Sequence, residues 1–428
     1  MVIPMEQQKI DILVVGSGGR EHAVVKKLRE SPHAGKLYCA PGNGGIAQDA
    51  QCVPIGAEDV DGVVRFAKEH GVGLVVVTPD NPLMLGMADA LETAGIRAFG
   101  PAQKAAEIEG SKVFSKDLMK KYGIPTAGYE VFKDPAEALR YIERQGKYPA
   151  IIKADGLALG KGVVIAQNAS EAREALRRIM EDKIFGASGN RVVIEEFLTG
   201  PEVSVLSFTD GKTLVPMVSS KDHKRALDGD RGPNTGGMGT ISPNPYYTPE
   251  IAARCMKEIF LPTVEAMNRE GRPFKGCLYF GLMLTTDGPK VIEYNARFGD
   301  PETQVVLPRL KTDLVEIFEA VIDGTLDRLA IEWDDRAAAC VVAASGGYPG
   351  GYDKGLPITG AKEAGALPDV VVYHAGTRLE DGRLLTAGGR VLGVTALGAT
   401  LDEALAKAYD GLSRIRFDRM QFRRDIGR

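Results

Sequence analysis

The sequence predicts an α/β protein of several domains, with a parallel sheet in its first domain. Between residues 10 and 99, short apolar stretches alternate with segments of helical periodicity, which is the pattern of a parallel sheet with helices on its faces. The chain has 428 residues, more than one hydrophobic core usually holds, so several domains are expected. Hydrophobic residues make up 44% of the chain and charged residues 26%, which is ordinary for a globular protein in water.

Charge, cysteine content and hydropathy exclude several classes of function. The net charge of −4 argues against a protein that coats nucleic acid. Five cysteines lie far apart without disulfide or zinc spacing, which indicates the reducing cytoplasm. No apolar run reaches the length of a membrane span. Residues 1–9 are polar and lack a signal-peptide core, so we expect a disordered extension there.

The first domain is expected to place a ligand at one edge of its sheet. Its predicted elements are the strands Ile10–Val15, Leu74–Val77 and Ile96–Phe99 and the helices Glu21–Arg29 and Leu83–Thr93. Glycine- and proline-rich turns lie at Gly16–His22, Pro41–Gly45 and Thr78–Pro82. Ligands of parallel sheets bind at the carboxyl ends of the strands, where these turns are expected.

The first of these turns is similar to a dinucleotide fingerprint but departs from it. Glu21 stands where the third glycine would be, so the pattern does not favour NAD. The backbone N–H groups of Gly18 and Gly19, at the start of a helix, favour a phosphate-binding turn instead. A plain tight turn is the alternative.

Two further modules follow along the chain. The second begins with a basic amphipathic helix at Ser111–Tyr122, and its other predicted elements are the strands Ala150–Ala154, Val163–Ala166 and Arg191–Phe197 and the helix Ser170–Glu181. The third follows Trp333 and is expected to be a small α/β domain with strands Ala337–Ala344, Val370–His374 and Val391–Ala396 and a helix at Leu401–Ile415.

A glycine-rich turn in the second module is framed by lysines. Lys153 precedes the turn on a predicted strand and Lys161 lies inside it, among Gly156, Gly160 and Gly162. Glycines let the backbone close over a ligand, and the two ammonium groups suit a polyphosphate. The run is not a Walker A motif, because the Ser or Thr after the lysine is replaced by Gly162. An ordinary glycine-rich hairpin is the alternative.

Two more polar runs lie in the central part of the chain. In Glu195–Glu202, the Glu202 carboxylate suits ribose hydroxyls and the backbone near Phe197 and Leu198 suits an adenine edge, although acidic strand ends are common. Lys221–Arg225 and the glycines of Asn234–Gly239 indicate an anion-binding loop, with a solvated surface run as the alternative. The sequence does not assign His22 or His223 as a general base.

The run Val291–Glu302 carries the densest chemistry of the chain. Glu293 and Asn295 are two residues apart at the end of a predicted strand, so their side chains are expected on one face. A carboxylate and an amide oxygen suit Mg²⁺, which keeps its other positions for water and phosphates. Arg297 adds a planar cation for a carboxylate or phosphate. A solvated strand end with scattered charges is the alternative.

Taken together, the motifs resemble the ATP-grasp superfamily and, within it, the phosphoribosylamine–glycine ligase family. The similarity runs from about Ile10 to Gly427. Its specific marks are Gly18–His22, Pro41–Gly44, Asp222–Arg225, Asn234–Gly239, Asn295–Glu302 and Arg423–Gly427. Where the family usually has Gly-Pro-Glu-Ala-Pro-Leu, this chain has Thr78–Leu83, so Asp80 replaces a glutamate.

The resemblance implies a fold, a reaction and a setting. The implied fold has an N-terminal parallel-sheet domain (10–110), a linker helix (111–126), an ATP-grasp lid (127–190), a central catalytic domain (191–330) and a C-terminal α/β domain (331–428). The implied reaction is ATP-dependent ligation of glycine to 5-phosphoribosylamine through glycyl phosphate, in purine biosynthesis. A cytoplasmic monomer or weak oligomer is expected, without nucleic acid or membrane partners. An ATP-grasp ligase for formate or bicarbonate and a silent nucleotide-binding regulator are the alternatives.

The resemblance also implies roles for individual residues. ATP phosphates would be held by Lys112, Lys153, Gly160, Lys161 and Gly162, and adenine and ribose by Glu195, Phe197, Leu198 and Glu202. Glu293 and Asn295 would bind Mg²⁺ or Mn²⁺, and Asp222 and Arg297 would hold glycine. The phosphoribosylamine site would be lined by Gly18, Gly19, Asn43 and Asp80. Lys153, Asp222 and Arg297 would act in catalysis.

Overall fold

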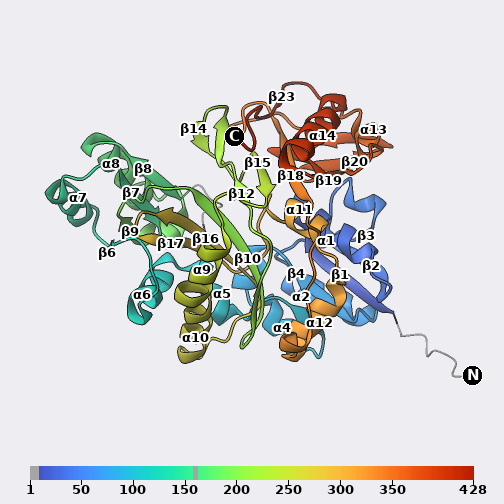
Figure 1. Cartoon of the computed structure of the whole chain (residues 1–428), viewed down its shortest axis with the longest axis horizontal. Helices are drawn as coiled ribbons and strands as arrows, with labels where there is room; N and C mark the ends of the chain where they lie inside the picture. The colour runs from blue at the N-terminus through green and yellow to red at the C-terminus, as the bar shows by residue number, and fades with distance from the viewer. Residues whose placement is uncertain (1–8, 158–161) are drawn as a thin grey trace, which may run out of the picture.

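The structure is a computed structural model that describes residues 9–157 and 162–428 (Figure 1). Its first sheet is parallel throughout, with strand order β3-β2-β1-β4-β5. The strands are β1 (Ile10–Gly16), β2 (Ala34–Pro41), β3 (Gln51–Cys52), β4 (Leu74–Val77) and β5 (Arg97–Phe99), and the helices are α1 (Gly19–Arg29), α2 (Val60–Glu69), α3 (Asp80–Met84), α4 (Met87–Thr93) and α5 (Gln103–Gly110). The predicted parallel sheet is confirmed.

Two details of this domain differ from the sequence prediction. The helix expected at Leu83–Thr93 is broken into α3 and α4, because Gly86 between them adopts a φ of +80°. The sequence reasoning also missed β2, β3 and α2. The three glycine- and proline-rich turns follow β1, β2 and β4, so they do meet at the carboxyl edge of the sheet as expected.

The lid is a separate antiparallel sheet with strand order β6-β9-β7-β8. Its elements are β6 (Tyr129–Phe132), α7 (Pro135–Gln145), β7 (Ala150–Ala154), β8 (Val163–Ala166), α8 (Ala169–Leu176) and β9 (Val192–Glu195). A short apolar core between this sheet and its helices includes Ile142, Ile152 and Ile194. In Figure 1 the lid projects to the left of the rest of the molecule, and α6 (Lys112–Tyr122) connects it to α5.

The central domain is built on a second antiparallel sheet with strand order β11-β10-β16-β17. Its elements are β10 (Glu202–Asp210), β11 (Leu214–Pro216), β16 (Lys275–Thr285), β17 (Gly288–Asn295), α9 (Pro249–Cys255), α10 (Leu261–Arg269), α11 (Thr303–Val306) and α12 (Leu314–Asp323). One apolar core continues from this sheet into the first domain and joins Val203 and Phe280 to Leu13 and Val75. The metal-strand candidate β17 therefore rests on a large shared core.

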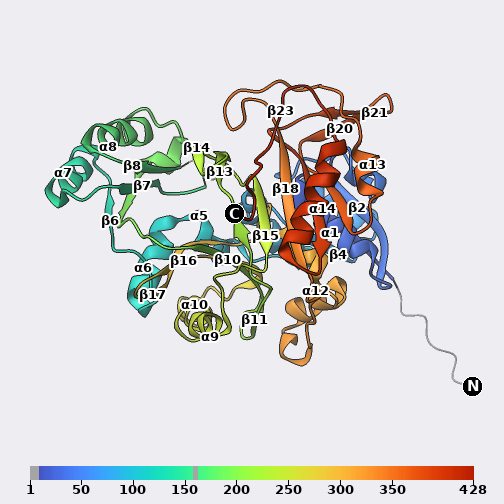
Figure 2. The same ribbon diagram turned by 45° about the horizontal axis from the view of Figure 1, so that its top comes forward.

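The C-terminal sheet takes in strands from the middle of the chain. Its order is β12-β15-β18-β22-β19, with β23 on β18. The elements are β12 (Lys221–Asp222), β15 (Gly239–Ser242), β18 (Ala337–Ser345), α13 (Ala361–Gly365), β19 (Val370–His374), β22 (Arg390–Gly398), α14 (Leu401–Arg414) and β23 (Met420–Gln421). Between β12 and β15, the strands β13 (Arg225–Leu227) and β14 (Arg231–Asn234) form a hairpin, and Figure 2 shows it between the lid and the C-terminal domain.

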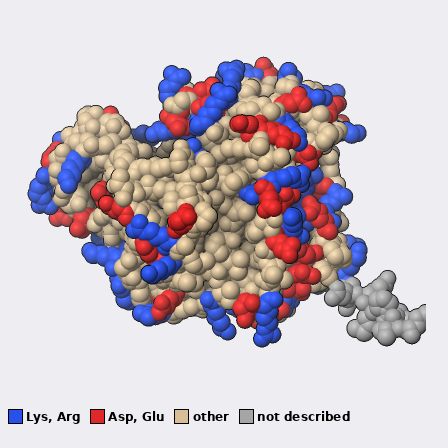
Figure 3. All heavy atoms as spheres, in the orientation of Figure 1, with Lys and Arg blue, Asp and Glu red and all other residues tan. Residues whose placement is uncertain are grey.

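The surface is mixed in charge. On the face shown in Figure 3, acidic and basic side chains are interspersed. Every helix of the described residues is too short or too polar to cross a lipid bilayer.

Candidate active site

The strand β17 presents Glu293 and Asn295 on one face, while Tyr294 between them turns into the core against Phe280. This arrangement confirms the expected alternation. Lys224 Nζ lies 3.5 Å from Glu293 Oε1 and 3.6 Å from Glu202 Oε2. The carboxylate and the amide oxygen together fit a hard divalent cation that also takes phosphate oxygens.

Positive charge is concentrated around Glu293. Burial by itself raises the pKa of Glu293, but Lys224, Lys153 and Lys112 outweigh it and hold the pKa below its usual value. These lysines come from the loop after β12, from β7 and from α6. The convergence of such distant segments on one carboxylate produces the kind of field that a polyphosphate and its metal require.

Two of the three predicted phosphate lysines, Lys112 and Lys153, are anchored in the structure. Lys112 Nζ donates to Gly156 O at 2.6 Å. Lys153 Nζ donates to Ile292 O at 3.1 Å, and so reaches the backbone beside Glu293. Gly162 accepts a hydrogen bond from the Ala154 N–H at 2.9 Å and closes the base of the glycine-rich turn. Gly160 and Lys161 lie outside the described residues.

Glu195 has a partner that the sequence reasoning missed. Its carboxylate lies between two buried lysines, with Lys153 Nζ at 2.8 Å and Lys116 Nζ at 2.9 Å. Lys116 also donates to Thr126 Oγ1 at 2.8 Å, and burial lowers its pKa to about 8. A lysine one helical turn after Lys112 is the signal that was available, since residues four apart share a helix face.

The expected adenine and ribose residues lie where the lid joins the central sheet, between the end of β9 and the start of β10. Phe197 and Leu198 follow the end of β9, and the Phe197 side chain is 38% exposed. Glu202 begins β10 with an exposed side chain, near Lys224. The exposed Phe197 ring and the Glu202 carboxylate therefore lie near the two ends of the short connection between β9 and β10.

Arg297 is held by a carboxylate that the sequence did not reveal. Its Nη2 lies 3.0 Å from Glu109 Oε1 and donates to Asn295 Oδ1 at 3.1 Å. Glu109 at the end of α5 also accepts the Ala296 N–H at 2.7 Å. The buried Nε of Arg297 has no hydrogen-bond partner among the described residues. Part of the guanidinium is therefore fixed by the protein, and one buried donor is left over.

Asp222 lies beneath the glycine-rich part of its loop. Its Oδ1 accepts the His223 N–H at 2.7 Å. Gly237 adopts a φ of +119°, and a Cβ there would lie 2.6 Å from Asp222 Oδ1, so only glycine permits this close approach. Burial raises the pKa of Asp222 well above its ordinary value, and nearby Glu302 raises it further. An additional cation beside Asp222 would lower the pKa of this carboxyl group again.

The first glycine turn is closed by its own glutamate. The Gly18 N–H donates to Glu21 Oε2 at 2.5 Å, which explains why an acid replaces the third glycine. That N–H group is therefore already used in this structure. Gly19 packs so closely on Gln304 that a Cβ would lie 2.6 Å from the Gln304 amide nitrogen.

The other expected substrate residues are held at the same sheet edge. Asn43 donates to Ser17 O and His374 O, each at 2.8 Å, and accepts the Gly45 N–H at 2.9 Å. Asp80 begins α3 and accepts the Asn81 N–H at 2.9 Å. The negative charge of Asp80 contributes to the raised pKa of Arg297, which shows that the first and central domains share one polar region.

Both histidines singled out in the sequence are structural. His22 Nε2 lies 2.9 Å from Asp49 Oδ2, and His22 Nδ1 accepts the His374 N–H at 2.7 Å. His223 Nε2 accepts the Gly427 N–H at 3.0 Å, and burial lowers the pKa of His223 to about 4. Each imidazole joins distant segments of the chain, and these contacts give neither histidine the role of a general base.

The fold and the site define an ATP-grasp protein. The biotin carboxylase domain of the Hydrogenobacter thermophilus 2-oxoglutarate carboxylase has the same fold, with a TM-score of 0.74 at 17% identity over 97% of this chain and 92% of that one. A family model described as the ATP-grasp (A) domain of phosphoribosylglycinamide synthetase matches residues 110–303, and the N and C domain models of that enzyme match residues 10–109 and 338–428.

The chain belongs to the phosphoribosylglycinamide synthetase family, whose members are also named phosphoribosylamine–glycine ligases. A phosphoribosylamine–glycine ligase of Rhodopirellula baltica is 51% identical over 98% of this chain and 97% of its own length. The crystal structure of that enzyme from Thermotoga maritima gives a TM-score of 0.85 at 34% identity, over 98% of this chain and 100% of that one. The chain is accordingly an ATP-dependent ligase of purine biosynthesis.

Proposed function

We propose that this ligase joins glycine to 5-phosphoribosylamine through glycyl phosphate, and that the residues above do so in the roles that the sequence suggested. The observation that carries the proposal is the pairing of Glu293 and Asn295 on one face of β17 with three lysines whose charges act on Glu293. A triphosphate with its metal fits this arrangement, because both positive charge and hard oxygen ligands are present.

In the first step, an oxygen of the glycine carboxylate attacks the γ-phosphorus of ATP, and the bond from that phosphorus to the β-phosphate oxygen breaks to release ADP. The negative charge of the phosphates would be neutralised by Lys112, Lys153 and Lys161. The backbone of the turn that contains Gly160 and Gly162 would close over the phosphates. A divalent cation, Mg²⁺ or Mn²⁺, held by Glu293 and Asn295 would add charge neutralisation at the transferred phosphoryl group.

Adenine and ribose would lie at Glu195, Phe197, Leu198 and Glu202, where the lid joins the central sheet. The exposed Phe197 ring and the Glu202 carboxylate support this placement. Because the Glu195 carboxylate is occupied by Lys116 and Lys153, we propose that Glu195 contributes through Lys153 as well as through its place in the hinge.

Glycine would be oriented by Arg297 and Asp222. The guanidinium of Arg297 would hold the attacking carboxylate, and its unpartnered Nε supports this role. The ammonium group of glycine would lie at Asp222, where it adds positive charge beside two neighbouring carboxylates, Asp222 and Glu302.

In the second step, the amine of 5-phosphoribosylamine attacks the acyl carbon and phosphate leaves, while the amine loses a proton. Gly18, Gly19, Asn43 and Asp80 would line its site at the edge of the first sheet. Lid closure would exclude water from the acyl phosphate during this step. We place the enzyme in the cytoplasm as a monomer or weak oligomer. The domain boundaries expected from the sequence need two changes, because β9 belongs to the lid sheet and β12 and β15 belong to the C-terminal sheet.

The decisive experiment measures ADP release with each substrate omitted in turn. Release that requires both glycine and phosphoribosylamine supports the proposal. Release with formate or bicarbonate in place of glycine would identify another ATP-grasp ligase, and nucleotide binding without any release would identify a regulator.

A further inference from the structure

The segment Arg423–Gly427, here called the clamp segment, crosses the loop that carries Asp222. Within that loop, residues 225–234 form the hairpin of β13 and β14. In Figures 1 and 2 the mark at the C-terminal end lies beside this hairpin. Nearly two hundred residues separate the two segments in the sequence, as in the contact between Asp228 and Arg424.

The contacts between the two segments run along the first strand of the hairpin and its turn. Arg423 Nη1 donates to Asp230 Oδ1 at 2.7 Å and to Arg225 O at 3.2 Å. The Arg424 N–H donates to Asp228 Oδ1 at 2.8 Å. These contacts are complemented by a hydrogen bond in the opposite direction, from the Gly229 N–H to Asp425 Oδ2 at 2.7 Å.

The clamp segment also reaches both ends of the Asp222 loop. The Gly427 N–H donates to His223 Nε2 at 3.0 Å, next to Asp222 itself. At the other end, a Cβ on Gly239 would lie 2.7 Å from Ile426 Cδ1, so the strand β15 begins directly against this side chain. The loop is therefore held at its start, its tip and its end by five consecutive residues.

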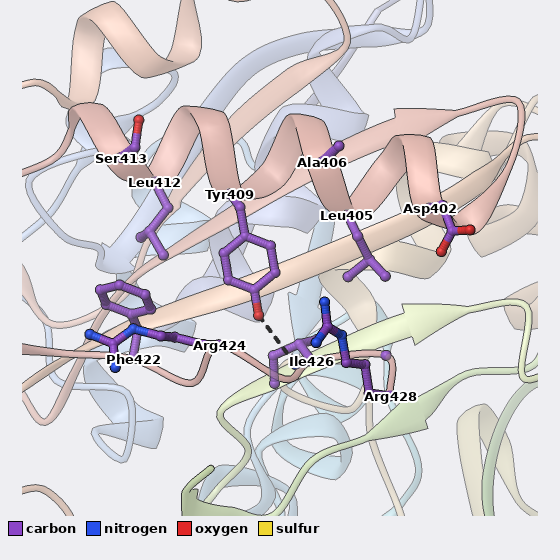
Figure 4. A pocket seen from close by; sticks show the side chains of 11 residues that line it. Asp402, Leu405, Ala406, Tyr409, Leu412, Ser413, Phe422, Arg424, Ile426 and Arg428 are labelled. Atoms are coloured by element: carbon purple, nitrogen blue, oxygen red, sulfur yellow. Dashed lines mark hydrogen bonds between the residues drawn. The ribbon is translucent and has the colours of Figure 1, made fainter. Parts of the chain in front are cut away.

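The clamp segment is itself rigidly anchored. Arg423 is 1% exposed and forms a fork with Asp425, whose two carboxylate oxygens each lie 2.8 Å from a guanidinium nitrogen. Tyr409 of α14 donates its hydroxyl to Arg423 O at 2.9 Å and accepts the Ile426 N–H at 3.2 Å. Figure 4 shows the second of these bonds, with the clamp segment lying beneath α14.

The hairpin needs such support because its own structure is weak. It pairs only at Arg225 with Asn234 and at Leu227 with Arg231, with a register irregularity between these pairs. Its tip is exposed, and Asp230 adopts a φ of +51°, a left-handed conformation that is uncommon for residues other than glycine. Arg423 is the residue that pairs with Asp230.

We propose that the clamp segment is a positioning element for glycine, which sets the loop so that Asp222 lies at the correct place for the substrate amine. The proposal rests on the proposed function, since it takes Asp222 as the glycine residue. Arg423, Asp425 and Tyr409 are positioning residues, because they act through the loop and do not touch the substrate.

The test compares Arg423→Gln, Asp230→Asn and the double variant in titrations of all three substrates. If the clamp acts on glycine, each single variant should raise the glycine KM by about tenfold and lower kcat by roughly threefold, while the ATP KM stays within about twofold. The double variant should add little to Arg423→Gln, because that change already removes the contact that Asp230→Asn weakens. Arg423→Lys should restore only part of the loss, since lysine lacks the fork.

A second readout separates positioning from general stability. Amide hydrogen exchange should become faster at residues 225–239 in Arg423→Gln and should stay unchanged in the lid. Tyr409→Phe, which removes two hydrogen bonds without a change in charge, should shift exchange and glycine KM in the same direction by a smaller amount. Arg419→Gln is the matched control, because Arg419 is an exposed arginine of the same domain that pairs with Asp353.

The outcomes separate a failure of the clamp proposal from a failure of the proposed function. Equal loss for all three substrates, with faster exchange throughout the C-terminal domain, would overturn the clamp and leave Arg423 as a stability residue. Faster exchange at the loop without a change in glycine KM would also overturn it. Asp222→Asn tests the function separately: if Asp222→Asn raises the glycine KM and Arg423→Gln does not, only the clamp fails.

Discussion

The lid sheet and the central sheet carry two halves of one site but are held by different forces. The central sheet shares an apolar core with the first domain, and Val203, Phe280 and Val291 are completely buried in it. The lid has its own small core, which contains Ile152 and Ile194 and is separate from the larger one. The central sheet is therefore held by a large shared core, whereas we expect the lid to change its position more easily, because its core is separate.

Polar contacts connect the lid to the rest of the molecule. Asp155 Oδ1 accepts hydrogen bonds from Ser111 Oγ and the Val113 N–H, each at 3.1 Å. Lys112 and Lys153 add bonds across the boundary, to Gly156 O and Ile292 O, and Lys116 pairs with Glu195 there. Such contacts exchange readily with water or with a ligand, unlike a buried apolar interface, because each contributes little net free energy. The comparison teaches that an apolar core holds the metal strand, whereas polar contacts hold the two phosphate lysines at the lid boundary.

The largest effect is expected on the central sheet. Glu293→Gln should lower turnover by roughly 100-fold or more, because the metal ligand next to the phosphates is lost. The thermal unfolding midpoint should change little, since the side chain lies on the open face of β17. Lys290→Gln on the same strand is the control, because Lys290 pairs only with exposed Asp287. Near-normal turnover of Glu293→Gln at limiting Mg²⁺ would remove the metal assignment.

The next effect concerns Arg297, which follows the strand β17 of that sheet. Arg297→Lys should raise the glycine KM and lower kcat, each by about tenfold, because lysine cannot reproduce the planar fork that orients a carboxylate. ATP affinity should change little. Steady-state titrations of the three substrates check this, and a defect confined to the ATP titration would move Arg297 to the triphosphate site.

A smaller effect is expected at Lys116, where α6 contacts the lid strand β9. Lys116→Met should raise the ATP KM by about fivefold with little change in kcat, because Glu195 then draws Lys153 away from the phosphates. Since the pKa of Lys116 is about 8, its ion pair with Glu195 is present below that pH and is lost as the pH rises through it. The wild-type ATP KM should therefore rise above about pH 8, and this rise should vanish in the variant.

The control for that experiment is Lys120→Met, on the exposed face of the same helix. It should match the wild type in both ATP KM and pH profile. If the alkaline rise persists in Lys116→Met, another group is responsible and the lid lysine is positioned independently of Lys116.

The smallest effect is on dynamics. Hydrogen exchange across residues 127–157 and 162–189 should slow when ATP binds, because the lid then gains contacts that its small core does not provide. Exchange in β16 and β17 should be slow in both states. Equal exchange in the lid with and without saturating ATP would contradict a closing lid and erase the difference between the two sheets.

Local sequence patterns determined much of the fold and of the candidate site. The strands around Lys153 and the helix after Ser111 were predictable because neighbours in sequence set alternation, periodicity and caps. The same holds for the metal strand, where Glu293 and Asn295 share a face in any strand. The break at Gly86 was not predicted, because a single glycine is compatible with a helical pattern. Its positive φ is visible only in the structure.

Only the tertiary structure decided which charges meet. Glu109 and Arg297 are far apart in sequence, as are Lys116 and Glu195 or Arg423 and Asp230, and no periodicity relates the members of a pair. Their contacts arise from the packing of whole sheets and helices, which brings their ends together at one edge. The sequence by itself determined the chemical groups of this ligase and their local geometry, while the folded chain decided which carboxylate holds which cation, because ion pairing depends on distance in space.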